Sequence, residues 1–296
     1  MQQIVECVPN FSEGRRPEVI DAIVAGILSV PGAHLLDVQS DADHNRTVVT
    51  FVGQPEPVLE AAFEGARIAA RLIDMAQHSG EHPRMGATDV IPFIPVRGVT
   101  MDDCVQLAGR LGQRMGQELD IPVYLYGQAA SRPERTNLPD VRRGEFEGIR
   151  DSIGSDPARD PDFGPRRLGS AGATAVGARA FLIAFNVYLN SDNVEIARKI
   201  AKTVRHSSGG LRFVQAMGVL VDGQAQVSMN LTDFNKTALH VVVELVRREA
   251  ARYGALISHS ELVGLIPQQA LLDAATWYLQ LDGFKPDQVL ENRLTA

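Results

Sequence analysis

Two histidines four residues apart, with a glutamate just before the second, lie in the segment HSGEHPRMGATD (residues 78–89). His78, Glu81 and His82 match the pattern H-x-x-E-H, in which both histidines bind zinc from one face of a helix. A glycine lies within this spacing and Pro83 follows directly, and both residue types oppose a helix. We therefore expect a loop, with a zinc hydrolase using His78 and His82 as an alternative.

The same loop also offers a proton-transfer group. An unperturbed imidazole has a pKa of about 6.5, so a histidine such as His82 can give and take protons near neutral pH. Glu81 and Asp89 can orient it, and the planar fork of Arg84 suits a carboxylate. Solvated histidines in a plain loop are the other interpretation.

Polar residues gather in SDADHNR, between two strand-like runs: Asp41, Asp43, His44, Asn45 and Arg46. Such a composition is typical of a solvated turn. Its place at a sheet edge leaves a functional use open.

A glycine-rich piece, GSAGATAVGAR (residues 169–179), raises the question of nucleotide binding. It precedes a strand-like run and lacks the G-x-G-x-x-G spacing, and the chain has no Walker A lysine motif. We expect a flexible loop whose backbone approaches a flat ligand closely, with Arg166 and Arg167 nearby for carboxylates. A simple interdomain linker is the alternative.

The composition is that of a soluble globular protein of 296 residues, with 45% hydrophobic and 22% charged residues. This length favours two domains. No apolar run is long enough to span a membrane and the N-terminus does not match a signal peptide, so we expect a cytoplasmic location. Cys7 and Cys104 are too few for a disulfide framework. The net charge of -7 argues against nucleic-acid binding, including an RNA-recognition module.

Hydrophobic periodicity predicts the same order of elements in both halves of the chain, β-α-β-β-α-β. The first half adds one helix, which begins at Thr100 with Asp103 as its capping-box partner, and one strand, PVYLYG. In the second half, a turn at Asp222 and Gly223 joins two strands, and Gly254 ends a long helix. A last helix follows Pro267.

These patterns predict an α/β (α+β) fold of two ferredoxin-like βαββαβ subdomains with a ligand cleft between them. We place the subdomains at residues 1–176 and 177–296. The segment 128–172, rich in Pro, Arg, Asp and Gly, is expected to be a boundary or a functional loop.

Several long stretches resemble the formiminotransferase family and together cover nearly the whole chain. They are VECVPNFSEG, NRTVVTFVG, GEHPRMGATDVIPFIPVRGV, PVYLYG, PDFGP, GATAVGARAFLIAFNVYL, AQVSMNLTDF and ELVGLIP.

This resemblance implies transfer of a formimino group from N-formimino-L-glutamate to N5 of tetrahydrofolate, a late step of histidine breakdown. It implies tetrahydrofolate as co-substrate, no metal, and a homodimer with folate bound between two α/β subdomains. We expect a stand-alone transferase without the cyclodeaminase domain found in some members. Formyl transfer from 5-formyltetrahydrofolate to glutamate and a catalytically silent folate-binding protein are the alternatives.

The resemblance also assigns residues. His82 matches the catalytic histidine, and the folate-binding segment corresponds to Gly164, Pro165, Arg166, Arg167, Leu168, Gly169, Ser170, Ala171 and Gly172. This segment is about one residue shorter than the family form, which has small polar and aromatic residues where Arg166, Arg167 and Leu168 lie.

Matching stretches place four further residues in the expected ligand cleft: Asn10, Asp43, Asn45 and Arg46. Asp43 would stabilise the cationic formimino group, and Arg46, Arg84 or Arg179 would bind the substrate carboxylates.

Overall fold

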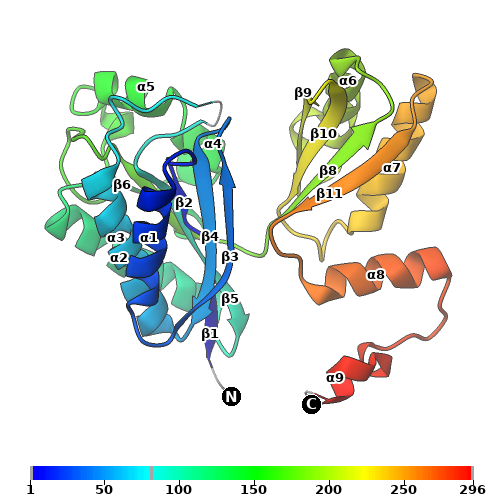
Figure 1. The fold of residues 1–296 in the computed structure, drawn as a ribbon, viewed down its shortest axis with the longest axis horizontal. Coiled ribbons are helices and arrows are strands. Elements are labelled where there is room, and N and C mark those ends of the chain that lie inside the picture. The colour runs from blue at the N-terminus through cyan, green and yellow to red at the C-terminus, as the bar shows by residue number, and fades with distance from the viewer. Residues whose placement is uncertain (1–2, 81–82, 295–296) are drawn as a thin grey trace. The chain divides into compact units, whose positions relative to one another are not determined.

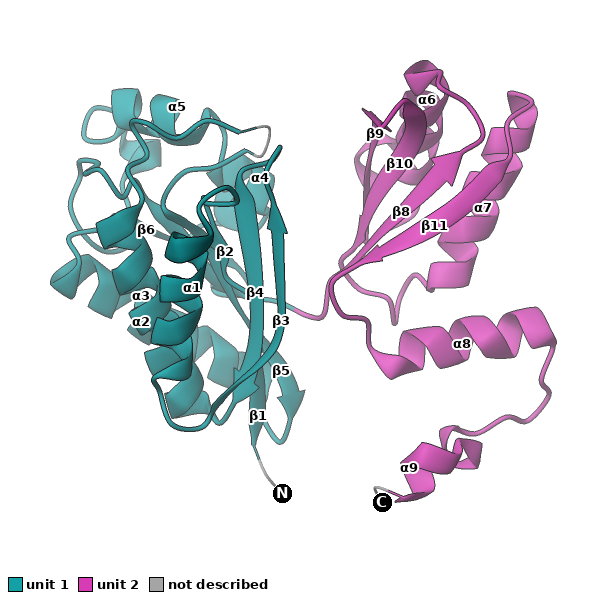
Figure 2. Ribbon diagram, in the orientation of Figure 1, with its two compact units in different colours: residues 1–179 teal, residues 180–296 magenta. Residues whose placement is uncertain are grey.

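The computed structural model describes residues 3–80 and 83–294, and the chain divides into two compact units, Met1–Arg179 and Ala180–Ala296 (Figures 1 and 2). Each unit has its own β-sheet with helices, one of seven strands and one of four. The predicted mixed α/β fold is therefore confirmed. No helix in the described ranges has the length and apolar character needed to cross a membrane.

Unit 1 is built on a mixed seven-stranded sheet. Its strands are β1 (Ile4–Cys7), β2 (Asn10–Phe11), β3 (Ala33–Asp41), β4 (Arg46–Gly53), β5 (Thr88–Arg97), β6 (Val123–Gly127) and β7 (Thr174–Ala178). Strands β1 and β2 both pair with β4 and with β5, so they act as one interrupted strand in the order β3, β4, β1/β2, β5, β7, β6. Strand β7 runs parallel to β5 and β6, whereas the other pairs are antiparallel.

Three long helices of unit 1 pack against the sheet and bury its main core (Figure 1). They are α1 (Pro17–Leu28), α2 (Pro55–Leu72) and α3 (Met101–Glu118). Proline occupies the first position of α1 and α2, where a missing N–H costs nothing. Thr100 and Asp103 form the predicted capping box at the start of α3, so this prediction is confirmed.

The prediction of a flexible loop over residues 169–179 is wrong for residues 174–178. Thr174–Ala178 form strand β7 between two parallel neighbours. All five residues are buried. Their small side chains fit a strand covered on both faces, and a Cβ on Gly177 would lie 2.4 Å from the carbonyl oxygen of Tyr126. Because these residues are small, their hydrophobic pattern is weak, and the sequence did not indicate a strand here.

The segment between β6 and β7 also contains regular structure that the sequence did not indicate. It includes α4 (Leu138–Val141), α5 (Glu145–Ser152) and the 3-10 turns η1 (Pro133–Arg135) and η2 (Pro157–Arg159). Buried Val141 and Ile149 from these helices pack with Tyr124, Tyr126 and Met85 in a smaller core. This segment is therefore a packed part of unit 1.

Unit 2 has the predicted order β-α-β-β-α-β, followed by two more helices. Its elements are β8 (Ile183–Leu189), α6 (Val194–Val204), η3 (His206–Ser208), β9 (Val214–Val221), β10 (Gln224–Leu231), α7 (Leu239–Arg252), β11 (Ile257–Val263), α8 (Gln268–Leu279), η4 (Pro286–Gln288) and α9 (Leu290–Leu294). The strands are antiparallel in the order β11, β8, β10, β9. Asp222 and Gly223 join β9 to β10 with φ of 48° and 75°, which suits a tight hairpin turn.

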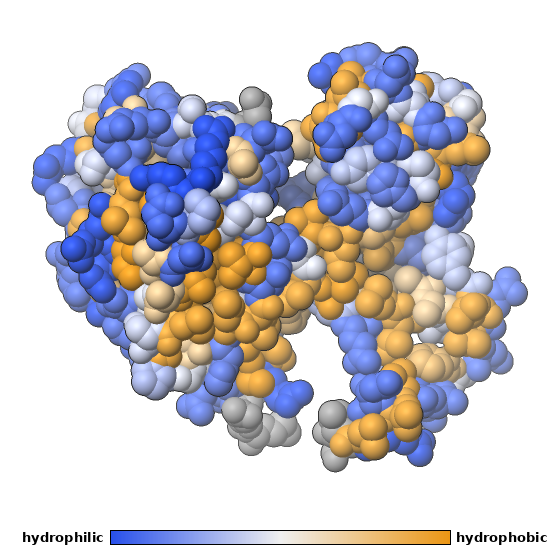
Figure 3. Space-filling view, viewed as in Figure 1, coloured by the Kyte–Doolittle hydropathy of each residue, from blue (hydrophilic) through white to orange (hydrophobic). Residues whose placement is uncertain are grey.

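The C-terminal helices α8 and α9 keep large apolar side chains exposed (Figure 3). These are Leu271, Trp277, Leu279, Leu290 and Leu294. Exposed apolar surface of this kind is often covered by another chain.

Two glycines of α3 give a matched test of how tightly this helix packs. A Cβ at Gly109 meets nothing within 4 Å, whereas a Cβ at Gly116 would lie 2.6 Å from the backbone nitrogen of Gly164. We predict that Gly109→Ala raises the free energy of unfolding by about 0.5–1 kcal/mol through helix propensity. Gly116→Ala should lower it by about 1–3 kcal/mol through overpacking.

Urea unfolding of both variants measures this difference. Equal effects at the two positions would show that α3 does not pack closely against the start of the 164–172 segment.

Candidate functional site

Two segments that the sequence singles out lie side by side at one end of the sheet of unit 1. The Ala87 N–H donates to the Ala171 carbonyl at 2.8 Å, and the Ala173 N–H donates to the Met85 carbonyl at 2.9 Å. These bonds join the loop that precedes β5 to the 164–172 segment. The predicted catalytic loop and the predicted folate-binding segment therefore meet in space.

His82 and Glu81 lie outside the described residues, but both flanks of these positions are described. Before them in the chain, Gly80 packs closely, because a Cβ there would lie 2.4 Å from the His44 carbonyl oxygen. Pro83 follows them in the chain. The loop is therefore closely packed on the side that precedes His82.

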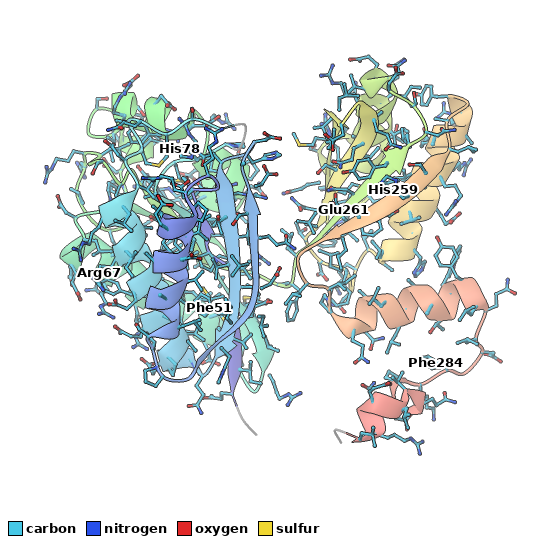
Figure 4. The ribbon with its side chains drawn as sticks, viewed as in Figure 1. Phe51, Arg67, His78, His259, Glu261 and Phe284 are labelled. Atoms are coloured by element: carbon cyan, nitrogen blue, oxygen red, sulfur yellow. The ribbon has the colours of Figure 1, made fainter. Side chains whose placement is uncertain are left out.

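His78 lies in unit 1 (Figure 4), and both of its ring nitrogens are hydrogen-bonded. Arg84 Nε donates to His78 Nδ1 at 3.3 Å, so Nε2 carries the proton and donates to the Asn45 carbonyl at 3.1 Å. Burial lowers the pKa of His78, and the nearby charge of Arg84 lowers it further. His78 is thus held as a neutral imidazole with no ring nitrogen left for a metal.

The zinc alternative gains no support from the described residues, within which no three His, Cys, Asp or Glu side chains are placed to hold a metal ion. Two of its three side chains, Glu81 and His82, are outside that set.

Asn45 fastens the β3–β4 turn to the two segments around it. Its Oδ1 accepts the Gly14 N–H at 2.9 Å, and its Nδ2 donates to the Ser79 carbonyl at 2.9 Å. Its backbone has a φ of 49°, in the left-handed region that asparagine tolerates better than most residues. Asn45, predicted to lie in the ligand cleft, is 8% exposed. Its side chain links the β3–β4 turn to Gly14 and Ser79.

Arg84 binds two carboxylates of this same chain. Its Nη1 donates to Glu145 Oε2 at 2.9 Å, and its two terminal nitrogens donate to the carboxylate of Glu147 at 2.8 and 2.7 Å. The Phe146 N–H donates to the Arg84 carbonyl at 2.9 Å. The hydrogen bonds to Glu147 raise the pKa of the guanidinium. The guanidinium of Arg84, predicted to bind a substrate carboxylate, therefore links the loop before β5 to the start of α5.

Asp89 is a buried anchor at the start of β5. Its Oδ1 accepts the Met85 N–H at 2.9 Å, and its Oδ2 accepts a short hydrogen bond from Arg142 Nη2. Burial raises the pKa of Asp89, and the charge of Arg142 opposes that rise. Asp89, predicted to orient His82, accepts the backbone N–H of Met85, three residues further along the chain.

The other predicted cleft residues of unit 1 differ in exposure. Asn10 on β2 is half-buried, and its Nδ2 donates to the Val8 carbonyl at 3.2 Å. Asp43 lies in the exposed β3–β4 turn. Arg46 begins β4, and burial lowers the pKa of its guanidinium.

The arginines of the 164–172 segment pair with acids of unit 1. Arg166 contacts Asp160 at 3.0 Å, and Arg167 contacts Asp120 at 2.7 Å. Both arginines remain exposed, and such surface pairs contribute little stability. They remain available to exchange these partners for an anionic ligand.

The remaining residues of this segment shape its backbone. Gly164 and Gly172 have φ of 84° and 70°, and a Cβ on Gly172 would lie 2.4 Å from the Met85 carbonyl oxygen. Leu168 packs against two of the cores of unit 1. Between these points, Pro165, Gly169, Ser170 and Ala171 are exposed or half-buried.

Sequence reasoning missed Arg142, Glu145 and Glu147. They lie more than fifty residues from their partners Asp89 and Arg84, so no local spacing connects them. The sequence feature that could have indicated them is the concentration of charged residues in VRRGEFEG, within the segment 128–172.

Together, the fold and these loops define an α/β protein with a polar candidate site at one end of the sheet of unit 1. Hydrogen bonds and ion pairs within the chain hold the segments of this site together. Family models match both units: the formiminotransferase domain, N-terminal subdomain, over residues 4–179, and the formiminotransferase domain over residues 184–291.

Close relatives agree with these models. The chain is 48% identical to a glutamate formimidoyltransferase of Streptococcus pyogenes serotype M1, covering 99% of both chains. It is 50% identical to one of Thermoplasma acidophilum, covering 98% of this chain and 97% of the relative. A formimidoyltransferase-cyclodeaminase of Rattus norvegicus is 53% identical, covering 94% of this chain and 53% of that protein. The chain belongs to the formiminotransferase family.

The lowered pKa of His78 predicts a pH dependence of stability. Because the unfolded histidine binds a proton first as the pH falls, its contribution is full above about pH 6.5 and is lost as the pH falls through the folded pKa. We predict that the free energy of unfolding of wild type falls more between about pH 7.5 and 5.5 than that of His78→Gln.

Urea unfolding at the two pH values measures both losses. Equal losses would mean that His78 is not held neutral in the folded protein.

Proposed function

We propose that this chain transfers the formimino group of N-formimino-L-glutamate to N5 of tetrahydrofolate, releasing L-glutamate, in histidine degradation. The observation that carries the proposal is 48% identity to a glutamate formimidoyltransferase over 99% of both chains. Matching family models over both units support it. Tetrahydrofolate then acts as the second substrate of the transfer.

His82 is the proton-transfer group in this proposal. The N5 amine of tetrahydrofolate attacks the formimino carbon and forms a new C–N bond, which gives a tetrahedral intermediate. His82 takes the proton from N5 and delivers it to the glutamate nitrogen as the old C–N bond breaks. One imidazole thus serves as base and then as acid, and it is neutral again at the end.

The described neighbours of His82 support this role. Pro83 follows it directly, and Met85 and Ala87 are hydrogen-bonded to the 171–173 backbone. A folate bound along the 164–172 segment would therefore lie near the loop that carries His82. Holding both substrates at one place supplies much of the rate by proximity.

Exposed polar groups around this loop would bind the charged parts of the substrates. Asp43, on the exposed turn, would stabilise the cationic formimino group, and Asn10 and Arg46 would contact bound substrate from the sheet. Arg166 and Arg167 would exchange their surface partners for carboxylates of the ligands.

Three broader proposals accompany this function. We take the two units as ferredoxin-like subdomains, which the strand order of unit 2 supports. The ligand cleft expected between them is part of the same proposal. A cytoplasmic homodimer is also proposed, and the exposed apolar side chains of α8 and α9 are consistent with association.

The test compares glutamate release from formiminoglutamate and tetrahydrofolate by wild type, His82→Ala and His78→Ala. We predict that His82→Ala lowers kcat by about 10²–10⁴-fold, because the proton transfers lose their carrier, while folate affinity stays near that of wild type. His78→Ala should lower kcat much less. The exposed His34→Ala serves as a control.

Near-normal turnover by His82→Ala would remove this histidine from the mechanism. Equal losses in His82→Ala and His78→Ala, together with loss of bound zinc, would favour the zinc alternative. Turnover with 5-formyltetrahydrofolate and glutamate, and none with formiminoglutamate, would assign the formyl reaction.

A further inference from the structure

Two arginines of unit 1 act on one buried carboxylate. Asp89, with 2% of its side chain exposed, accepts a short hydrogen bond from Arg142, and the charge of Arg46 also acts on it. Asp89 also accepts the Met85 N–H, so much of its acceptor capacity is used inside the chain. One carboxylate therefore faces two positive charges.

The two arginines differ in their acidic neighbours. Burial and the like charge of Arg142 lower the pKa of the Arg46 guanidinium, and the charges of Asp89 and Asp41 oppose this. The side chain of Arg142 is 14% exposed, so water screens it poorly. Arg142 shares the carboxylate of Asp89 with Arg46, and a poorly screened guanidinium with a shared counter-charge favours an anionic ligand.

Arg142 also has an unused hydrogen-bond donor. Its Nε is buried and has no acceptor within the part of the chain that the structure describes. A buried donor without a partner costs roughly 1–3 kcal/mol, so such groups usually serve a ligand or water. The guanidinium of Arg142 thus offers both charge and an open donor.

Arg142 borders a pocket of about 280 Å³. The pocket is lined by Pro83, Pro139, Arg142, Arg143, Gly144 and Glu145. Its volume suits a small ligand or one end of a larger one. Because Pro83 follows His82 in the chain, a group bound here would lie close to the proposed reaction centre.

The other two charged residues lining this pocket already have partners. Arg143 pairs with Asp140 at 2.5 Å, and its side chain is 74% exposed. Glu145 accepts from Arg84 at 2.9 Å. Arg142 is therefore the lining residue best placed to meet a buried anion.

We propose that Arg142 binds the carboxylate of a glutamyl group in this pocket. Asp89 holds Arg142 in place, while Arg84 is engaged in fastening the loop. This inference rests on the proposed function, which supplies two sources of such a carboxylate: the formiminoglutamate donor and the glutamyl tail of the folate.

The test uses Arg142→Lys, which keeps the charge but loses the planar fork, with Arg143→Lys as the matched control in the same pocket. We predict that Arg142→Lys raises the KM of at least one substrate by about tenfold or more, with kcat changed by less than about threefold. Arg143→Lys should change both constants by less than about twofold. Equal effects of the two variants, or no change in either KM, would overturn the proposal.

A tetrahydropterin without the p-aminobenzoylglutamate tail separates the two sources. A higher KM for formiminoglutamate in Arg142→Lys, with either acceptor, assigns the carboxylate to the donor. A higher KM for tetrahydrofolate that disappears with the tailless acceptor assigns it to the folate tail. Both results support a glutamyl carboxylate at Arg142.

Direct binding measurements distinguish loss of this site from misfolding and from failure of the proposed function. The double variant Arg142→Gln/Asp89→Asn removes both charges of the buried pair, and thermal unfolding checks that it folds. Calorimetry with L-glutamate and with p-aminobenzoyl-L-glutamate should show at least a tenfold weaker affinity for one of them than in wild type. Wild-type affinity for both would overturn the inference even if turnover is normal, whereas Arg142-dependent binding without turnover would sink the proposed function alone.

Discussion

The candidate site of unit 1 depends on the buried carboxylate of Asp89. It binds the Met85 N–H from the loop before β5 and Arg142 from the segment before α5. Removing one partner from such a buried pair leaves an uncompensated charge and typically costs about 3–5 kcal/mol. Asp89 therefore joins two segments that are far apart in the sequence and fixes the backbone at Met85, three residues after His82.

The same region tolerates unfavourable backbone conformations. Asn45 and Glu145 both have a positive φ, 49° and 56°, and both contact the His78–Arg84 pair directly. Conformations of this kind cost about 1–3 kcal/mol each and persist only where the surrounding contacts impose them. Both residues contact one loop, so the packing around this loop imposes their backbone geometry.

Much of the fold follows from sequence patterns. Helical periodicity, the Thr100–Asp103 capping box and the Asp222–Gly223 turn are local signals, and the structure confirms each of them. Strand β7 was missed because its buried residues are Thr, Ala, Val and Gly, which carry little hydrophobic signal. Its burial comes from neighbouring elements, which a local window cannot include.

The candidate site was predictable in part. Sequence identified the loop around His82 and the 164–172 segment, and the structure places the described parts of both in contact. It suggested Arg84 for a substrate, whereas the partners of this arginine lie some sixty residues away, at Glu145 and Glu147. Pairings at such separation depend on tertiary packing, so residue type and spacing could not reveal them.

In the proposed function, folate binds where these two segments meet. Amide hydrogen exchange, followed by mass spectrometry with and without saturating 5-formyltetrahydrofolate, tests it without requiring turnover. We predict slower exchange on ligand binding in residues 83–87 and 164–173. Unchanged exchange in both segments while the ligand is bound would contradict it.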